Sequence, residues 1–323
     1  MCTSIAWNNG GFFFGRNLDL EVDFGQRVVI TPRRQRQVFR KEDAMELHYA
    51  MIGMATVMEG CALYADAMNE KGLCVAGLNF PENAYYPAEW DGREHCISPF
   101  ELPWWVLGQC ATVQEARTLL ERTKIVGIPF SGDVPISPLH WHIADGQTSI
   151  VLECMREGMR IHVNPVGVLT NNPPFEFHLN NLRQYMNLTP LCPENRFSDK
   201  LELSPFGRGM GAIGLPGDAS PASRFVRAAF LTHNAICDAQ DSVGQFFHLL
   251  DSVAMTRGSV IAPGDKWEQT LYSCCMDVDE GVYYYKTYTN NQLTAVHLRN
   301  ANLDGEALLE FPLEMKQHIL HVN

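Results

Sequence analysis

The feature that most constrains this chain is its first stretch, MCTSIAWNNGGFFFGRNLD at residues 1–19. Cys2 directly follows the initiator methionine, and its small side chain predicts that Met1 is removed. The thiol would then belong to the N-terminal residue, beside a free α-amino group that titrates near about 7.8, where a thiol titrates near about 8.5. At neutral pH such an amine accepts the thiol proton, so one residue supplies a nucleophile and its base.

The residues after Cys2 predict a β-hairpin. Two apolar, β-prone runs at 3–7 and 12–15 flank the turn sequence Asn-Asn-Gly-Gly at 8–11. A strand that begins within a sheet would hold the terminal residue in place, as catalysis by that residue requires.

The second strand of the hairpin returns polar side chains to the Cys2 end. Arg16 beside the sulfur would favour the thiolate, and Asp19 would hydrogen-bond the ammonium and orient it. The alternative interpretation is structural: Cys2 is a buried strand cysteine, and Arg16 and Asp19 form a surface ion pair.

Polar residues also follow apolar runs further along the chain. Asn79 closes the run 73–79 just before a Phe-Pro step, and Asn171 and Asn172 follow the run 166–170. Strand ends present polar side chains to a ligand on a rigid support, although asparagine is also a common turn residue. Both interpretations stay open from the residues alone.

Five motifs, in order along the chain, carry a family resemblance. They are MCTSIAW at 1–7, FGRNLDLE at 14–21, NEKGLCVAGLNFP at 69–81, VLTNNPPFEFH at 168–178 and SPASRFVR at 220–227. With the TYT stretch at 287–289 they extend over nearly the whole chain. The sequence resembles the choloylglycine hydrolase family of N-terminal-nucleophile hydrolases, whose members are bile salt hydrolases and penicillin V acylases.

The resemblance implies an amide hydrolase that requires no metal and no organic cofactor. Its catalytic residues would be Cys2, Arg16, Asp19, Asn79, Asn171 and Arg224. Asn79 and Asn171 would form the oxyanion hole. Asn172 is a weaker candidate than Asn171 for the second of these positions. From the residues alone, Arg224 falls in the first turn of a helix that Ser223 can cap, and it is either a site residue or a solvated one.

The resemblance also implies the substrate. Asparagine at position 79 is typical of bile salt hydrolases, whereas several penicillin acylases carry tyrosine there. We therefore expect a glycine- or taurine-conjugated bile salt. Penicillin V is the first alternative, and an N-acyl homoserine lactone is another.

Apolar residues predict the wall of an acyl pocket. The loop at 128–139, IPFSGDVPISPL, is more hydrophobic than solvent exposure would require, and it either lines a pocket or packs on the core. Tyr85, Tyr86 and Trp90 allow the same two interpretations. The expected substrate-binding residues are Leu18, Leu20, Ala65, Ile128, Phe130 and Leu139.

Charge and cysteine usage argue against several other classes. The net charge of −12 would repel nucleic acid and anionic membranes. Ten scattered cysteines without a C-x-x-C pair predict reduced thiols, and there is no signal sequence or apolar run long enough to span a membrane, so we expect a cytoplasmic protein. A hydrophobic-ligand carrier would not need a thiol at position 2, and a thiol-redox protein would need a paired motif.

Two further patterns predict no ligand site. His140 and His142 would face one side of a strand, but zinc needs three or four ligands. The run at 209–214 spells a dinucleotide fingerprint without the flanking strand and helix, so we interpret it as a glycine-rich loop.

The chain is expected to form a single domain over 1–323, because no linker or repeat divides it. Strand-like runs lie at 28–31, 47–52, 62–66, 73–79, 148–155, 159–163, 270–277, 281–288 and 293–298. Helices are predicted after Ser98, Thr112 and Ser223 and over 241–255. This order fits an α+β fold of two stacked antiparallel sheets with helices on both outer faces. The family resemblance implies its name, the four-layer αββα sandwich, and a homotetrameric assembly.

Overall fold

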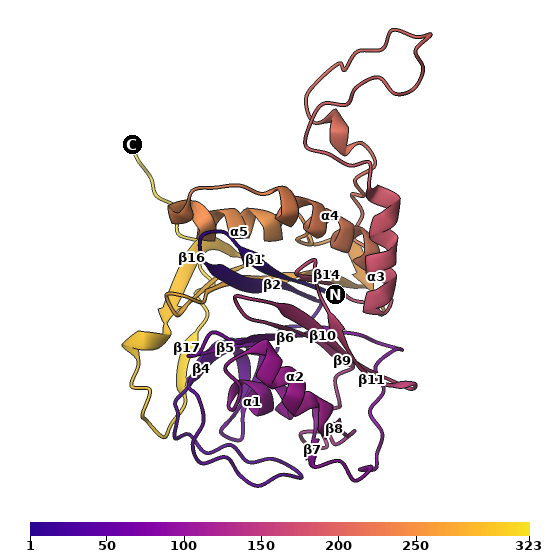
Figure 1. Ribbon diagram of the computed structural model, residues 1–323. Coiled ribbons are helices and arrows are strands. Elements are labelled where there is room, and N and C mark those ends of the chain that lie inside the picture. Colours follow the sequence, from indigo (N-terminus) through magenta and orange to yellow (C-terminus); the bar gives the residue numbers. More distant parts are fainter.

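The computed structural model describes residues 1–323, which form two stacked β-sheets with helices on both outer faces (Figure 1). Helices α4 (Pro221–Asn234) and α5 (Ser242–Asp251) cover the outer face of one sheet. Helices α1 (Leu102–Leu107) and α2 (Val113–Glu121) cover the outer face of the other. The structure confirms the predicted α+β, four-layer αββα fold.

The first sheet combines the first two strands of the chain with strands from its last quarter. Its strand order is β12-β1-β2-β14-β15-β16, with β13 paired to β14, and every pair is antiparallel. The strands are β1 (Cys2–Asn8), β2 (Phe12–Leu20), β12 (Val168–Leu169), β13 (Val260–Ala262), β14 (Lys266–Asp277), β15 (Val282–Thr287) and β16 (Asn290–His297). The predicted hairpin is confirmed, and its second strand lies between β1 and β14 in the middle of the sheet.

The second sheet is antiparallel in the order β11-β10-β9-β6-β5-β4-β3-β17. Its strands are β3 (Arg27–Thr31), β4 (Met51–Met58), β5 (Cys61–Asn69), β6 (Cys74–Asn79), β9 (Leu139–Ala144), β10 (Ser149–Met155), β11 (Gly158–Val163) and β17 (Leu309–Pro312). A small parallel pair, β7 (His95–Ile97) with β8 (Thr123–Ile125), lies beside the helices of this side. The remaining helix is α3 (Phe175–Asn181).

Local capping explains where the helices begin. Before α1, the Glu101 carboxylate accepts the Ser98 N–H at 2.6 Å, and before α2, Thr112 Oγ1 accepts the Glu115 N–H at 3.2 Å. Both helices begin after the capping residues that the sequence predicts. The predicted cap at Ser223 is wrong, because Ser220 caps α4 and proline occupies its first position.

Other differences arise where the chain finds non-local partners. The strand predicted over 47–52 begins only at Met51, because the backbone N–H groups of His48 and Tyr49 donate to Arg33 and Gly108 outside the sheet, each at 3.0 Å. Neither α3 nor β17 was predicted. Strand β17 forms by pairing with β3, which lies near the opposite end of the sequence.

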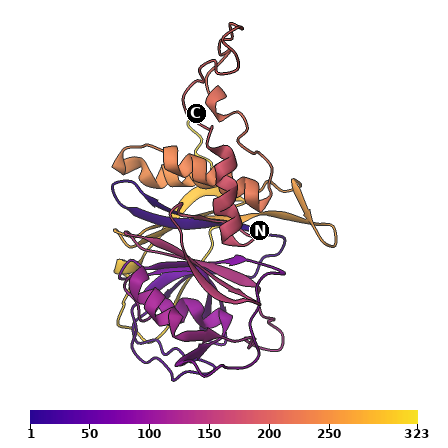
Figure 2. The same cartoon turned by 45° about the vertical axis from the view of Figure 1, so that its right-hand side comes forward.

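Between α3 and α4 the chain makes a long excursion away from the sandwich, which Figures 1 and 2 show from two sides. We call residues 186–215 the arm. Its regular structure is limited to one 3-10 turn, Met210–Ala212, which lies within the glycine-rich run at 209–214; the rest of that run is a loop. No helix of the structure is both long and apolar enough to cross a membrane.

His142 joins the two sheets through the core. It lies on β9, is fully buried, and its ring nitrogens contact Ser4 Oγ of β1 at 2.8 Å and Ser149 Oγ of β10 at 2.6 Å. Burial, and secondarily the nearby His140, lower the pKa of His142 to about 3. The folded protein therefore holds this ring neutral.

We expect this histidine to make the protein sensitive to acid. Below pH 6.5 the unfolded chain binds a proton that the folded chain refuses, so the free energy of unfolding falls by up to about 1.4 kcal/mol per pH unit until the pH approaches 3. Denaturant titrations between pH 7 and 4 should show a shallower dependence in His142→Gln than in the wild type. His318→Gln, at an exposed site, should keep the wild-type slope. An unchanged slope in His142→Gln would contradict this account.

Candidate active site

Cys2 is the first residue of β1 and is only 2% exposed. Its backbone N–H donates to Asn171 Oδ1 at 2.8 Å, and its carbonyl accepts from Arg224 Nη1 at 2.5 Å. The residue before it, Met1, donates its terminal ammonium to the Asp19 carbonyl at 2.5 Å and to the Glu268 carboxylate. Position 2 is thus held on both sides by side chains from distant segments.

Arg224 is the centre of the contacts around Cys2. Its guanidinium, fully buried at the start of α4, also donates to Thr3 Oγ1 at 2.6 Å and to Asn171 Oδ1 at 2.8 Å. Burial lowers the pKa of Arg224, while the nearby Asp19 and Cys2 oppose that shift. One side chain therefore connects β1 to the strand end that carries Asn171.

Arg16 points from β2 towards the second sheet. Its Nη1 donates to the carbonyls of Ala65 at 3.2 Å and Gly77 at 2.5 Å, while its buried Nη2 has no protein partner. Burial opposes its charge, but Cys2 and then Tyr272 raise the pKa of Arg16 beyond its ordinary value. The side chain is fully buried, so the surface ion pair considered from the sequence does not form.

Asp19 is fully buried at the same end of β2. Its Oδ1 accepts from Thr270 Oγ1 at 2.6 Å, and its buried Oδ2 has no partner. Burial raises the pKa of Asp19, with Arg224 as the largest opposing influence. The carboxyl group thus keeps one acceptor free near the chain terminus.

The two asparagines that were singled out at strand ends meet in space. Asn79, at the end of β6, offers its backbone carbonyl to Asn171 Nδ2 at 2.7 Å. Asn172 instead donates to the carbonyl of Pro81 at 2.7 Å. The amide of Asn171 therefore bridges the Cys2 backbone and the Asn79 strand end, although these segments are far apart in the sequence.

Comparison with known proteins agrees with this geometry. Residues 2–311 match the family described as linear amide C-N hydrolases, choloylglycine hydrolase family. The chain belongs to the choloylglycine hydrolase family.

Curated relatives and solved structures match the chain over all or nearly all of its length. The chain is 47% identical to a bile salt hydrolase/transferase from Lactiplantibacillus plantarum and 40% identical to one from Clostridium perfringens, with 100% of both chains covered in each case. A C2A variant of the conjugated bile acid hydrolase from Clostridium perfringens superposes with a TM-score of 0.93 at 39% identity, again over 100% of both chains. A penicillin V acylase from Agrobacterium tumefaciens shares the fold at a TM-score of 0.77 and 19% identity, over 98% of this chain and 94% of that one.

The structure separates the predicted substrate-binding residues of this family member into two groups. Leu18 pairs with Cys2 across the hairpin, Leu20 is half-buried at the end of β2, and the Ala65 carbonyl accepts from Arg16. Of these three, Leu18 is the direct cross-strand neighbour of Cys2. Whether they contact an acyl group stays a prediction.

The second group lies around the 128–139 loop. Phe130 is buried with its ring 5.3 Å from that of Phe100, Ile128 is half-buried, and Leu139 pairs with Asn79 in the sheet. Tyr86 is fixed by hydrogen bonds to the backbone of Leu139 at 2.8 and 2.9 Å. Phe130 is therefore packed in the core, which is one of the two interpretations of this loop, whereas Leu139 lies beside the end of β6.

Sequence reasoning missed three polar residues of this site. Thr3 accepts from Arg224, Thr270 donates to Asp19, and Glu268 contacts the terminal ammonium. The last two are two positions apart on β14 and so share a face of the sheet. That spacing was readable in the sequence, but nothing there indicated that β14 is the neighbour of β2.

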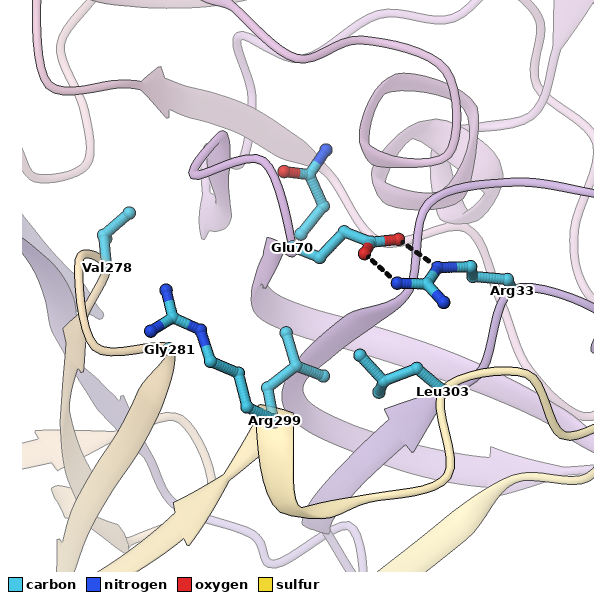
Figure 3. A pocket seen from close by; sticks show the side chains of 8 residues that line it. Arg33, Glu70, Val278, Gly281, Arg299 and Leu303 are labelled. Atoms are coloured by element: carbon cyan, nitrogen blue, oxygen red, sulfur yellow. Dashed lines mark hydrogen bonds and ion pairs between the residues drawn. The ribbon is translucent and has the colours of Figure 1, made fainter.

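A separate cavity of about 230 Å³, shown from close by in Figure 3, lies beside the turn between β14 and β15. The turn after Asp277 borders it, and Asp277 pairs with Phe13, five residues before the partner of Cys2 in β2. At the rise of a strand this is about 17 Å from Cys2. Arg33 donates to Glu70 there at 2.8 and 2.5 Å, so its charge is paired within the protein.

Replacing Arg224 by lysine tests whether the several N–H donors of its guanidinium group are needed. A single ammonium cannot reach Ala219, Cys2, Thr3 and Asn171 together, so we expect the free energy of unfolding to fall by about 2 kcal/mol. The kcat for amide hydrolysis should fall by more than the decrease in the fraction of folded protein explains. Denaturant titration and kcat measurements check the two effects.

Arg227→Lys is the matched control for Arg224→Lys. Arg227 lies three positions further along α4 and donates to the carbonyls of Ser252 at 2.7 Å and Pro216 at 2.8 Å, with no contact at the Cys2 end. It should lose stability but keep kcat. If both variants lose activity equally, Arg224 acts through the stability of α4 alone.

Proposed function

We propose that this protein hydrolyses the amide bond of glycine- and taurine-conjugated bile salts, with the Cys2 thiol as nucleophile and its own α-amino group as base. The observation that carries this proposal is the contact of Asn171 with both the Cys2 nitrogen and the Asn79 strand end. It supports a site in which the Asn171 amide lies between the Cys2 backbone and the strand end that carries Asn79.

The proposed mechanism begins with the removal of Met1. The freed amine would take the position from which the Cys2 N–H now donates to Asn171 at 2.8 Å. The unpartnered Oδ2 of Asp19 could accept from that amine and orient it. The guanidinium of Arg16, with its free Nη2, would favour the thiolate.

The reaction then has two steps. The thiolate attacks the amide carbonyl, and the tetrahedral oxyanion is stabilised by the side chains of Asn79 and Asn171, each such donor being worth roughly 3 kcal/mol of barrier. The ammonium returns its proton to the leaving glycine or taurine nitrogen, which leaves an acyl thioester. Water activated by the same amine hydrolyses the thioester and regenerates the thiol. No step requires a metal or an organic cofactor.

The choice of substrate rests on the relatives. Those at 47% and 40% identity carry the name bile salt hydrolase/transferase, while a penicillin V acylase matches at 28% identity over only 54% of this chain. Asparagine at position 79 supports the same choice over penicillin V and N-acyl homoserine lactones. Attack on the thioester by an amine in place of water would account for a transferase activity.

We further propose that residues 1–323 act as a single domain. One continuous hydrophobic core contains residues of both sheets together with α4 and α5, which supports this reading. The nucleophile lies within that shared core, so neither sheet could form the site by itself.

An assay of amino acid release tests the proposed chemistry. The wild type should release glycine from glycocholate and taurine from taurocholate, faster than it hydrolyses the side-chain amide of penicillin V. Cys2→Ala should be at least about a thousandfold slower on every substrate. Faster cleavage of penicillin V would keep the nucleophile but overturn the substrate, and equal rates in Cys2→Ala would overturn the nucleophile. Intact mass should show that Met1 is absent from the active protein.

We also propose that the protein is a homotetramer whose subunits contact each other through the arm. Several of its apolar side chains are exposed, namely Met186, Leu191, Phe197, Leu201, Leu203, Phe206 and Ile213. A run of this kind on a segment that stands away from its own core is typical of an interface.

The assembly prediction can be checked by light scattering after size exclusion. Phe197→Asp combined with Phe206→Asp should reduce the mass from four subunits to fewer, because each charge would be buried without a partner. Ile236→Asp, an equally exposed apolar site outside the arm, should leave the mass unchanged. A wild type that elutes as a monomer would overturn the proposal.

A further inference from the structure

A buried histidine lies between the two strand ends that carry the asparagines. His140 is on β9, which pairs with β6 in the second sheet (Figure 1). Its side chain has no solvent exposure. One ring nitrogen, Nε2, is 3.0 Å from the carbonyl of Thr170, the residue before Asn171. The proposed mechanism gives this ring no role.

The partners of His140 determine its charge. Nε2 faces a backbone carbonyl, which can only accept, and Nδ1 lies 3.2 Å from Glu153 Oε1. That same oxygen already accepts the Phe175 N–H at 2.9 Å, as an ionised carboxylate does. Both ring nitrogens therefore have to donate. A ring that donates from both nitrogens is an imidazolium.

Glu153 supplies the matching negative charge. It is fully buried on β10; burial raises its pKa, but His140 and then His162 outweigh that effect and bring the pKa of Glu153 to about 2. His162 Nε2 lies 3.5 Å from Glu153 Oε2, and Glu176 lies 3.8 Å from the other nitrogen of His162. The remaining titratable groups nearby are His142 and His178, and burial lowers the pKa of both.

The face of the same ring contacts the other strand end. Phe80, the residue directly after Asn79, stacks on His140 with ring centroids 4.3 Å apart and planes 5° from parallel. A cation over an aromatic face is attracted by the ring quadrupole, most strongly when both are desolvated. His140 therefore contacts the neighbour of each asparagine, one by a hydrogen bond and one by stacking.

We propose that His140 is a positioning residue that, as an imidazolium paired with Glu153, sets the spacing between Asn79 and Asn171. This inference rests on the proposed function, because it assigns the two asparagines to the oxyanion hole. The charge aligns the Thr170 carbonyl and the Phe80 ring at once. It acts through these residues and does not touch the substrate.

His140→Gln tests the proposal. Glutamine keeps a donor for the Thr170 carbonyl but removes the charge and the flat ring. We expect kcat for the conjugated bile salt to fall about tenfold to hundredfold, as misplacement of a reacting group by a fraction of an ångström does, with KM changed less than threefold. His142→Gln is the matched control, because it lies two positions along the same strand and face but contacts Ser4 and Ser149. It should lose stability and keep kcat.

Glu153→Gln adds a readout that a purely structural role would not change. Without its counter-ion, the His140 ring gives up its proton more readily as the pH rises. Relative to the wild type, kcat of Glu153→Gln should therefore fall progressively with rising pH and recover towards acid. A constant ratio across pH would overturn the charged role.

The charge itself can be observed without any activity. Nitrogen NMR of the labelled wild-type protein at neutral pH should show both nitrogens of His140 protonated. A neutral ring, or a His140→Gln variant with wild-type kcat, would overturn the proposal. If the protein cleaved no bile salt at all, the proposed function would fail while the NMR result still decided the charge of this ring.

Discussion

The structure depends on the fixed, buried position of the N-terminal end of the chain at Cys2. Cys2 opens a central part of the first sheet, and its backbone groups need partners within the fold because water does not reach them. Asn171 and Arg224, which are 169 and 222 positions away along the chain, provide those partners. A terminal residue would otherwise fray. Here Cys2 is fixed by both partners, which supports its proposed role as the nucleophile.

This arrangement places charged groups in the interior of a β-sandwich. Taking a charge out of water costs several kcal/mol unless partners compensate for it, and Arg16, Asp19 and Arg224 are all fully buried. Backbone carbonyls and hydroxyl groups satisfy most of their bonding capacity. The atoms left over, Nη2 of Arg16 and Oδ2 of Asp19, both belong to side chains of β2 near Cys2. Unsatisfied buried groups are rare in folded proteins, so their gathering beside a thiol indicates a site prepared for a ligand.

Local patterns predicted what depends on nearby residues. The hairpin over β1 and β2 follows from its turn sequence, and α2 begins where Thr112 caps it. The predicted start of α4 at Ser223 was three residues late, because Ser220 is the cap and the proline at position 221 fits the first helical position. Strand β17 could not be predicted because it exists only through pairing with β3. Short segments of this kind carry almost no periodic signal.

By itself the sequence determined the chemical parts of the site: a cysteine at position 2, an arginine and an aspartate on the returning strand, and asparagines where apolar runs end. These are properties of local order, and five motifs in register identified the family. Only the tertiary structure decided which strands are neighbours, because pairing across more than a hundred residues depends on packing of the whole core and not on any local preference. It brought β14 beside β2 and Asn171 beside Asn79. It also enclosed His140 between two acceptors, which is the physical reason that this ring carries a charge no sequence pattern could reveal.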